Sequence, residues 1–377
     1  MPLTRRNFLS LSIASTLAVS ASPGLFAANP AAGLYDGSII IDGLGFPGGL
    51  SVDENAPLNP HELRDIKDSG LTATHITVGA VGTMTPLAAF EKIVRDIARW
   101  EREIDRNPEI LTRVRSSKDI QNARHGGQTG LIYGLQDGVS FEDEIERLST
   151  LHQLGVRIIQ PTYNRRNLLG DGCMETADAG LSRTGSEAVE RMNNLGILVD
   201  LSHCGRRTAA DVAAISNRPL SFTHTGCYEI AKHPRHRTDA EIRAIAETGG
   251  VIGIYIMPYL ARGKQPTAND VILHVEHAIQ VAGEDHVSIG TDGTISPTMV
   301  TPEYIENFQK ITRKRKKQGI AAPFETETGY LFANDLNTPR RFETLAGLLL
   351  DRGHSKQRVK KIMGANLVRL FEESWAV

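Results

Sequence analysis

Short apolar runs alternate with longer amphipathic stretches along most of the chain. The apolar runs predict eight strands, at residues 38–42, 71–78, 130–135, 156–161, 197–201, 220–223, 251–256 and 287–290. Between them, apolar residues at three- and four-residue spacing predict helices at residues 88–104, 142–154, 186–195, 207–215, 239–248 and 270–282. Gly155, Gly196 and Gly249 stand where helices should end, as C-terminal caps do.

This alternation of strand and helix is typical of a parallel sheet with crossover helices. Eight such units between residues 38 and 290 have the size of a closed barrel, so we expect an α/β fold of the (β/α)8 TIM type. An open, doubly wound sheet is the alternative, but no Gly-x-Gly-x-x-Gly motif opens its first unit.

The N-terminal residues have a pattern of their own. Arg5 and Arg6 precede Phe8-Leu9 and a run of small and apolar residues, which resembles a twin-arginine export signal with cleavage near Ala27 or Ala28. The alternative is a chance basic pair before an uncleaved anchor, although the apolar run is short for a membrane span. We expect residues 1–28 to be a signal peptide, residues 29–377 to form one barrel domain with C-terminal helices, and the mature protein to be periplasmic.

Two features near the C-terminus refine this domain. Residues 301–339 are polar and weakly periodic, and their basic cluster at 313–317 predicts the solvated face of a helix. Ser355 is the expected cap of a final helical pair that includes residues 359–371.

The charge content narrows the class of ligand, and the cysteine content argues against disulfides. The chain has 42 Lys and Arg against 44 Asp and Glu, so it offers no strong basic surface for nucleic acid, and a small molecule or peptide is the expected ligand. Cys173, Cys204 and Cys227 are too few for a disulfide framework, and we interpret them as small buried thiols.

Residues of metal-ligand type follow three of the predicted strands. His203 and His224 end the fifth and sixth strands, and Asp292 ends the eighth. The carboxyl ends of all strands meet at one rim of a parallel barrel, so these side chains should converge. Two neutral imidazoles and a carboxylate suit zinc, which would acidify a bound water, while Asp292 could be a ligand or the base that accepts the proton of that water.

The chain from about Gly130 to Asp292 resembles the renal or membrane dipeptidase family, whose amidohydrolase-like barrel holds two zinc ions and hydrolyses dipeptides. The resemblance is densest in Glu-Arg-Met-Asn-Asn-Leu-Gly-Ile at 190–197 and Val-Asp-Leu-Ser-His at 199–203. It continues through Thr-His at 223–224, His-Pro-Arg at 233–235 and Gly-Thr-Asp at 290–292. The resemblance implies a homodimer, and it implies that Arg235 binds the carboxylate of the substrate.

Departures from the family pattern concern the metal ligands. Leu44 and Phe46 replace the histidine and aspartate that follow the first strand in the family, and neither can bind a metal. Gln136 stands in place of the bridging glutamate, and Tyr163 in place of a histidine that contacts the reacting carbonyl. We therefore expect one zinc ion on His203 and His224, completed by Asp292 or Gln136, with Tyr163 donating a hydrogen bond to the substrate.

Other polar residues, in the middle of the second strand, before Leu44 and in the long loop after the fourth strand, could replace the missing ligands. For each of them a core hydrogen bond or a solvated loop is the favoured interpretation, and His233 and His236 could instead read substrate charge. The residues weighed as replacement ligands are His75, Asp42, Asp171, Glu175 and Asp178.

Three functions follow from these residues. The first is an exported metal-dependent hydrolase that cleaves dipeptides or a related small amide, in which Asp292 moves a proton and Arg235 with Tyr163 orients the substrate. The second is a catalytically inactive homologue that binds a peptide in the periplasm or assists the maturation of a metabolite. The third is a different hydrolase on the same barrel, such as a lactonase or deaminase.

Overall fold

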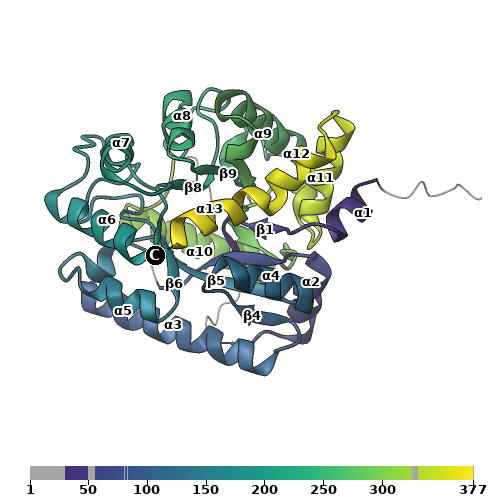
Figure 1. Ribbon diagram of the computed structural model, residues 1–377, viewed down its shortest axis with the longest axis horizontal. Helices are drawn as coiled ribbons and strands as arrows, with labels where there is room; N and C mark the ends of the chain where they lie inside the picture. The colour runs from purple at the N-terminus through teal and green to yellow at the C-terminus, as the bar shows by residue number, and fades with distance from the viewer. Residues whose placement is uncertain are drawn as a thin grey trace, which may run out of the picture.

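Eight parallel strands close into a barrel at the centre of the structure (Figure 1). Hydrogen bonds join them in the order β1-β3-β5-β6-β7 and β8-β9-β10. An isolated parallel bridge between Asp200 and Ser221 joins β7 to β8, and the amide of Gly43 donates to the carbonyl of Ile289 over 2.9 Å, which joins β10 to β1. The predicted TIM-type barrel is therefore confirmed. Its strands are β1 (Ile41–Asp42), β3 (Ala73–Thr77), β5 (Thr129–Leu135), β6 (Val156–Ile159), β7 (Leu198–Val199), β8 (Ser221–Thr225), β9 (Val251–Ile254) and β10 (Val287–Ile289).

This computed structural model describes residues 30–49, 56–79, 81, 82, 84–323, 325 and 330–376. The expected signal peptide at residues 1–28 lies outside the described residues. In the part that is described, no helix combines the length and apolar character needed to cross a membrane.

Among the described residues, three further short strands lie outside the barrel proper. β4 (Leu111–Arg113) pairs with the start of β5, and β2 (Gly45–Phe46) pairs with β11 (Gly293–Thr294). β2 follows β1 and β11 follows β10, so the pair of β2 and β11 extends the barrel wall at the rim where the strands end. Through this pair the segment that carries Leu44 and Phe46 is fixed against the segment that carries Asp292.

Helices surround the barrel and follow the predicted stretches closely (Figure 1). α5 begins at Arg147 instead of 142, because residues 139–141 form a separate 3-10 turn. Gly196 adopts a left-handed φ of 67° at the end of α6, as expected of a capping glycine. The helices are α1 (Pro30–Asp36), α2 (Pro60–Ser69), α3 (Pro86–Arg106), α4 (Ser117–Gly126), α5 (Arg147–Gln153), α6 (Arg183–Leu195), α7 (Arg206–Ile215), α8 (Asp239–Glu247), α9 (Ala268–Ala282), α10 (Pro302–Gln318), α11 (Arg341–Asp351), α12 (Lys356–Lys360) and α13 (Asn366–Trp375).

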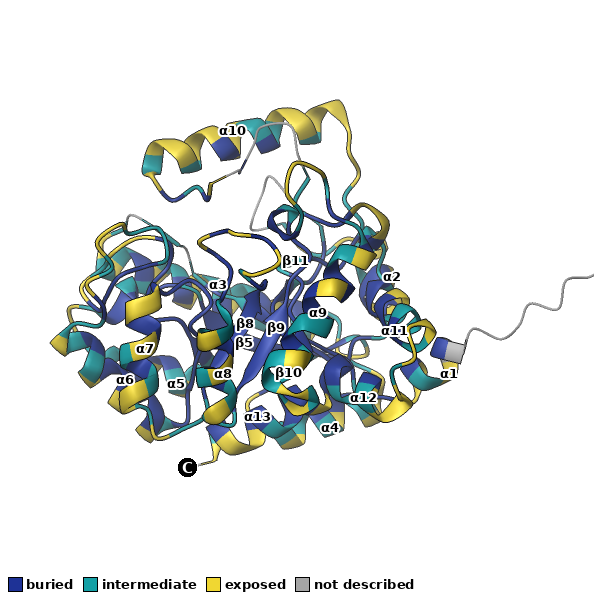
Figure 2. Cartoon of the chain, turned by 90° about the horizontal axis from the view of Figure 1, so that it is seen from above, coloured by how far each residue is buried: buried dark blue, intermediate teal, exposed yellow. Residues whose placement is uncertain are grey.

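The two ends of the barrel are covered differently. At the end where strands begin, Leu367, Leu370 and Phe371 of α13 pack against Ile41, Leu198 and other buried residues of the strands. Ser355 caps α12, as predicted, and α12 leads into α13 through a single π-helical turn. At the opposite end α10 lies above the rim (Figure 2). The functional side must therefore be the rim beneath α10, because α13 closes the other end.

The basic cluster of α10 only partly matches its prediction. Arg313, Lys314, Lys316 and Lys317 are exposed, as expected of a solvated face. Arg315 is directed toward the barrel, where its Nε donates to Oε1 of Glu325 over 2.6 Å. This contact joins α10 to the segment that follows it, and the hydrogen bond from Nη2 of Arg315 to the hydroxyl of Tyr163 joins α10 to the rim.

Candidate functional site

His203 and His224 meet at the rim, with their Nε2 atoms 3.1 Å apart. His203 follows β7, and His224 lies within β8, the next strand of the barrel. Both side chains are buried, and their ring centroids are 5.1 Å apart. The predicted convergence of the two histidines is therefore present in the structure.

The protonation of His203 follows from its contact with Asn164. Nδ1 of His203 lies 2.6 Å from Oδ1 of Asn164, whose amide nitrogen donates to the carbonyl of Ile320 over 2.8 Å. The amide nitrogen is thus directed away from the ring, and Oδ1 accepts a proton from Nδ1. His203 is thereby held with its proton on Nδ1 and a lone pair on Nε2.

The same protonation holds for His224, through a different partner. Oγ1 of Thr223 donates its only proton to Oδ2 of Asp200 over 2.6 Å. It therefore accepts from Nδ1 of His224 at 2.8 Å, because a hydroxyl group has one proton to give. Nε2 of His224 also carries a lone pair.

Two lone pairs face each other across 3.1 Å, an arrangement that requires a cation between them or a proton on one ring. Burial, reinforced by the charge of Arg235, holds the pKa of each histidine well below its usual value, which opposes the extra proton. Two zinc–nitrogen bonds at a tetrahedral angle would separate the nitrogens by about 3.3 Å. The donor set of His203 and His224 thus fits a zinc ion.

Asp292 occupies the rim after β10 in a strained conformation. Its φ is 55°, in the left-handed region that residues other than glycine rarely adopt, and its amide donates to the carbonyl of Leu44 over 2.7 Å. Burial raises the pKa of Asp292 to about 6, against the opposing charges of Arg235 and Arg315. The carboxyl group is therefore ionised at neutral pH and basic enough to take a proton.

Thr291 precedes Asp292, and Thr223 precedes His224. A buried aspartate binds each of these two threonines in the same way. Oδ2 of Asp42 accepts from Oγ1 of Thr291 over 2.6 Å, and Oδ1 accepts from the amide of Thr291 over 2.7 Å. Asp200 binds the hydroxyl and the amide of Thr223 in the same way. Through the two threonines, Asp42 positions Asp292 and Asp200 positions His224. Asp42 thus has a hydrogen-bonding role in the barrel wall.

Tyr163 lies against His203, with stacked rings whose centroids are 4.1 Å apart. Its hydroxyl accepts from Nη2 of Arg315 over 3.3 Å, which connects it to α10. Burial raises the pKa of Tyr163, so the hydroxyl keeps its proton and can donate it in a hydrogen bond.

Arg235 is 2% exposed and contacts the backbone beside the two histidines. Its guanidinium donates to the backbone carbonyls of Ser202 and His224, the second over 3.2 Å. The neighbouring Arg237 binds the carbonyls of Leu201, Ser202 and Cys204. Both cations thus fix the backbone around the histidines, and the expected grip of Arg235 on a substrate carboxylate stays a prediction.

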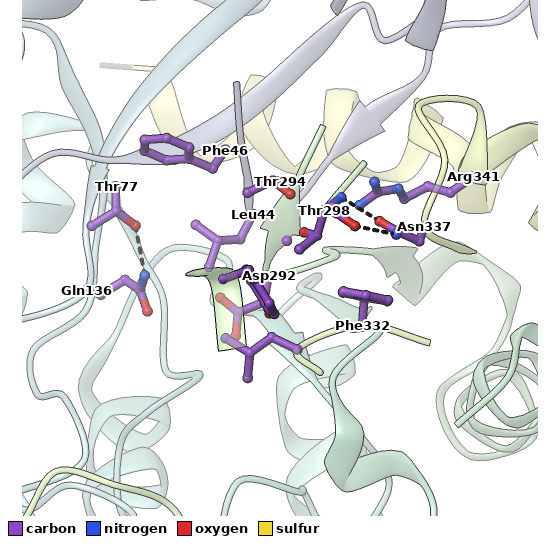
Figure 3. Close-up of a pocket in the computed structure, with 14 residues that line it drawn as sticks. Leu44, Phe46, Thr77, Gln136, Asp292, Thr294, Thr298, Phe332, Asn337 and Arg341 are labelled. Carbon is purple, nitrogen blue, oxygen red and sulfur yellow. Dashed lines mark hydrogen bonds between the residues drawn. The ribbon is translucent and has the colours of Figure 1, made fainter. Parts of the chain in front are cut away.

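Gln136 and the two apolar replacements, Leu44 and Phe46, line a cavity of about 240 Å³ beside Asp292 (Figure 3). Nε2 of Gln136 donates to Oγ1 of Thr77 over 2.8 Å. The hydrogen bonds of the described residues connect Gln136 to this wall of the cavity and to neither histidine. Its role as a metal ligand stays a prediction.

The other polar residues weighed as replacement ligands have local partners. Nδ1 of His75 faces the carbonyl of Gly43 at 2.8 Å, and Asp171 pairs with Arg166. His233 stacks on Tyr259, and Nδ1 of His236 lies 2.6 Å from the carbonyl of Ala231. These contacts agree with structural roles. Cys204 and Cys227 are buried free thiols, as predicted, and Cys173 is half-buried.

Several residues of the site were not among those predicted. Asn164 follows Tyr163 in a loop, and Arg315 lies inside a basic run whose other members are exposed, so neither stands out in the sequence. Tyr255, the residue after β9, is buried, and its hydroxyl has no hydrogen-bond partner among the described residues. Its position at a strand end was the signal that could have identified it.

Known proteins resemble this chain over most of its length. The family described as membrane dipeptidase (peptidase family M19) matches residues 59–319. Dipeptidase verJ of Clonostachys rogersoniana is 28% identical over 271 residues, which cover 71% of this chain and 61% of that protein. Dipeptidase tcpJ of Claviceps purpurea is 25% identical over 291 residues, 76% of this chain and 60% of that protein. The chain therefore spans less than two thirds of the length of either fungal relative.

Solved structures resemble the whole barrel. An amidohydrolase from Pseudomonas aeruginosa is 33% identical, with a TM-score of 0.79 over 92% of this chain and 99% of that one. A metallo peptidase from Rhodobacter sphaeroides, bound to a phosphinate mimic of the dipeptide L-Ala-D-Ala, has a TM-score of 0.72 over 90% of this chain and 100% of that one. At 18% identity the second likeness concerns the fold alone.

Proposed function

Because the chain belongs to the membrane dipeptidase family, we propose that it hydrolyses dipeptides or related small amides with one zinc ion. The observation that carries this proposal is the pair of buried imidazoles whose unprotonated Nε2 atoms face each other at 3.1 Å. The third residue of the expected donor set, Asp292, lies on the neighbouring part of the rim, but its carboxylate is not within 4.8 Å of both imidazole nitrogens. We therefore assign Asp292 the role of the base and not that of a third ligand. Leu44 and Phe46 offer no donor atoms for a second ion.

A zinc ion bound there would polarise the amide carbonyl and acidify a water molecule. The carboxylate of Asp292 takes the proton of the attacking water as the carbon–oxygen bond forms, and it returns the proton to the leaving nitrogen as the carbon–nitrogen bond breaks. The hydroxyl of Tyr163 donates a hydrogen bond to the carbonyl oxygen, where negative charge develops. The buried charge of Arg235 favours a substrate with a free carboxylate.

Metal content and hydrolysis test this proposal together. We expect the purified full chain to hold one equivalent of zinc by mass spectrometry and to release amino acids from a dipeptide panel. Asp292→Asn should lower kcat by about 10²- to 10⁴-fold. Asp143→Asn, at an exposed carboxylate on the outside of the barrel, is the matched control and should leave kcat unchanged. Two equivalents of zinc would refute the one-metal site, and the absence of hydrolysis with zinc, cobalt or manganese would refute the activity.

An inactive, ligand-binding homologue is the second candidate, and the apolar side chains of Leu44 and Phe46 favour it. Under this alternative, Leu44→His, Phe46→Asp and Gln136→Glu together should create hydrolysis that the unchanged protein lacks. If the unchanged protein is as active as the triple variant, this alternative fails.

The N-terminal twin-arginine sequence and the family resemblance bear on where the protein works and how it assembles. We propose that the twin-arginine sequence carries the folded protein to the periplasm, where it forms a homodimer. Replacing Arg5 and Arg6 with lysine should retain the protein in the cytoplasm, as fractionation would show. Light scattering after size-exclusion chromatography would measure the mass of the assembly.

A further inference from the structure

The cavity beside Asp292 lies where the first strand ends, at the positions where the family resemblance implies metal ligands. Its volume is about 240 Å³, and its lining includes Leu44, Phe46, Leu331 and Phe332. In Figure 3, Leu44 and Phe46 lie on one side of Asp292 and Phe332 lies on another. Pockets for drug-sized ligands have volumes of roughly 300–1,000 Å³, so this cavity fits one amino-acid side chain better than a larger molecule.

The polar groups of the cavity are largely occupied by one another. Gln136 binds Thr77, and the carboxamide of Asn337 binds the amide and the carbonyl of Thr298 over 2.8 and 3.0 Å. Arg341 donates to the carbonyls of Thr338 and Ile295. Two polar groups of the lining, the hydroxyl of Tyr304 and the carboxylate of Asp292, have no hydrogen-bond partner among the described residues. An acidic side chain entering the cavity would lose water and face the negative charge of Asp292, which is unfavourable.

Asp292 connects the cavity to the proposed reaction. It lies between Leu44 and Phe332 in the cavity wall, and its carboxylate accepts no hydrogen bond from any described residue (Figure 3). A side chain in the cavity would thus lie next to the group that takes the proton of the water. Occupancy by an apolar group would also exclude water from one side of this carboxylate.

We propose that this cavity binds one uncharged, apolar side chain of the substrate, such as that of leucine or phenylalanine. The proposal rests on the proposed function, because it names the substrate class of the same site. Its energetic basis is the burial of an apolar side chain against Leu44, Phe46 and Phe332, which corresponds to a gain of about tenfold or more. The apolar side chains that replace the missing metal ligands thereby determine which substrates the cavity selects.

Hydrolysis of matched dipeptides tests the proposal directly. We expect kcat/KM for Leu-Gly and Phe-Gly to exceed that for Gly-Gly and Asp-Gly by about tenfold or more, or kcat/KM for Gly-Leu and Gly-Phe to exceed that for Gly-Gly and Gly-Asp by the same factor. Phe46→Ala and Phe332→Ala should each remove this preference. Phe90→Ala removes a half-buried phenylalanine that does not line the cavity, and it should keep the preference.

A binding measurement separates this proposal from the proposed activity. Phe46 packs edge-on against Trp100, with ring centroids 5.7 Å apart, and Trp375 is the only other tryptophan of the chain. In a Trp375→Phe background, fluorescence of Trp100 should report binding of N-acetyl-phenylalaninamide at least about tenfold tighter than binding of N-acetylglycinamide, with or without a chelator. That preference without any hydrolysis would refute the activity and keep the cavity assignment. Equal binding of the two amides, or equal hydrolysis of apolar and polar dipeptides, would overturn the cavity assignment.

Discussion

The carboxamide oxygen of Asn164 accepts a hydrogen bond from Nδ1 of His203 over 2.6 Å. The nitrogen of the same carboxamide donates to the carbonyl of Ile320, two residues after the end of α10. One side chain thus determines which nitrogen of His203 can bind a metal and also holds the segment above the rim. The protonation of His203 and the position of α10 are therefore connected through Asn164.

Substitution of Asn164 should weaken metal binding. In Asn164→Leu, His203 loses the acceptor that fixes its proton on Nδ1, and we expect the affinity for zinc to fall by about 10- to 100-fold. Isothermal titration calorimetry with zinc would measure this change. Asn164→Asp keeps an acceptor for Nδ1 but loses the bond to Ile320, so it should retain zinc binding while hydrogen exchange near Ile320 becomes faster. Unchanged zinc affinity in the leucine variant would contradict the role given to this contact.

Thr223 should matter for both stability and metal binding. In Thr223→Val, Asp200 loses a buried hydroxyl donor and Nδ1 of His224 loses its acceptor, so we expect the free energy of unfolding to fall by about 1–3 kcal/mol. Zinc affinity should fall with it. Thr223→Ser keeps the hydroxyl and should restore both quantities, whereas failure of serine to restore zinc binding would contradict the role given to the hydroxyl. Denaturant unfolding and zinc titration give the two readouts.

Arg315 should anchor α10, in contrast to its exposed neighbours. Arg315→Leu leaves the buried carboxylate of Glu325 without its cation and removes the donor to Tyr163. Because Arg315 is partly exposed, we expect a loss of roughly 1–3 kcal/mol in unfolding free energy. Proteolysis at the end of α10 should also become faster. Arg313→Leu, two residues earlier on the exposed face, is the control and should change neither quantity. Equal proteolysis of the two variants would refute the anchoring role.

His274 should make the protein sensitive to acid. Its Nδ1 accepts from the amide of Cys227 over 2.8 Å, and burial lowers the pKa of His274 from 6.5 to about 4. Because this folded-state pKa lies below the unfolded value, the stabilisation is complete above about pH 6.5 and is lost as the pH falls toward 4, by about 3 kcal/mol in all. His274→Asn should reduce the slope of unfolding free energy between pH 7 and 5. His125→Asn, at an exposed helix end, should keep the slope.

The barrel could be predicted from the sequence because each strand of its wall is a short apolar run bounded by an amphipathic helix. β2, β4 and β11 have two or three residues each and do not fall within an apolar run, so they were not predicted. They matter for the site, since β2 and β11 bring Leu44 and Phe46 beside Asp292.

The candidate ligands could be predicted because they end strands, and the topology of a parallel barrel brings strand ends together. Asn164 and Arg315 could not, because each belongs to a segment whose position depends on tertiary contacts. The direction of the Arg235 guanidinium could not be predicted either. The sequence indicates a cation near the site, and only the structure shows that this cation binds backbone carbonyls.

The edge of the site that carries Leu44 and Phe46 is held by main-chain atoms. Asp292 donates to the carbonyl of Leu44, Ile295 donates to the carbonyl of Phe46, and β2 pairs with β11 without using either side chain. The identity of these two side chains is therefore decoupled from closure of the barrel. Evolution could exchange a metal-binding pair for an apolar pair here, or reverse the exchange, while the surrounding scaffold stays in register.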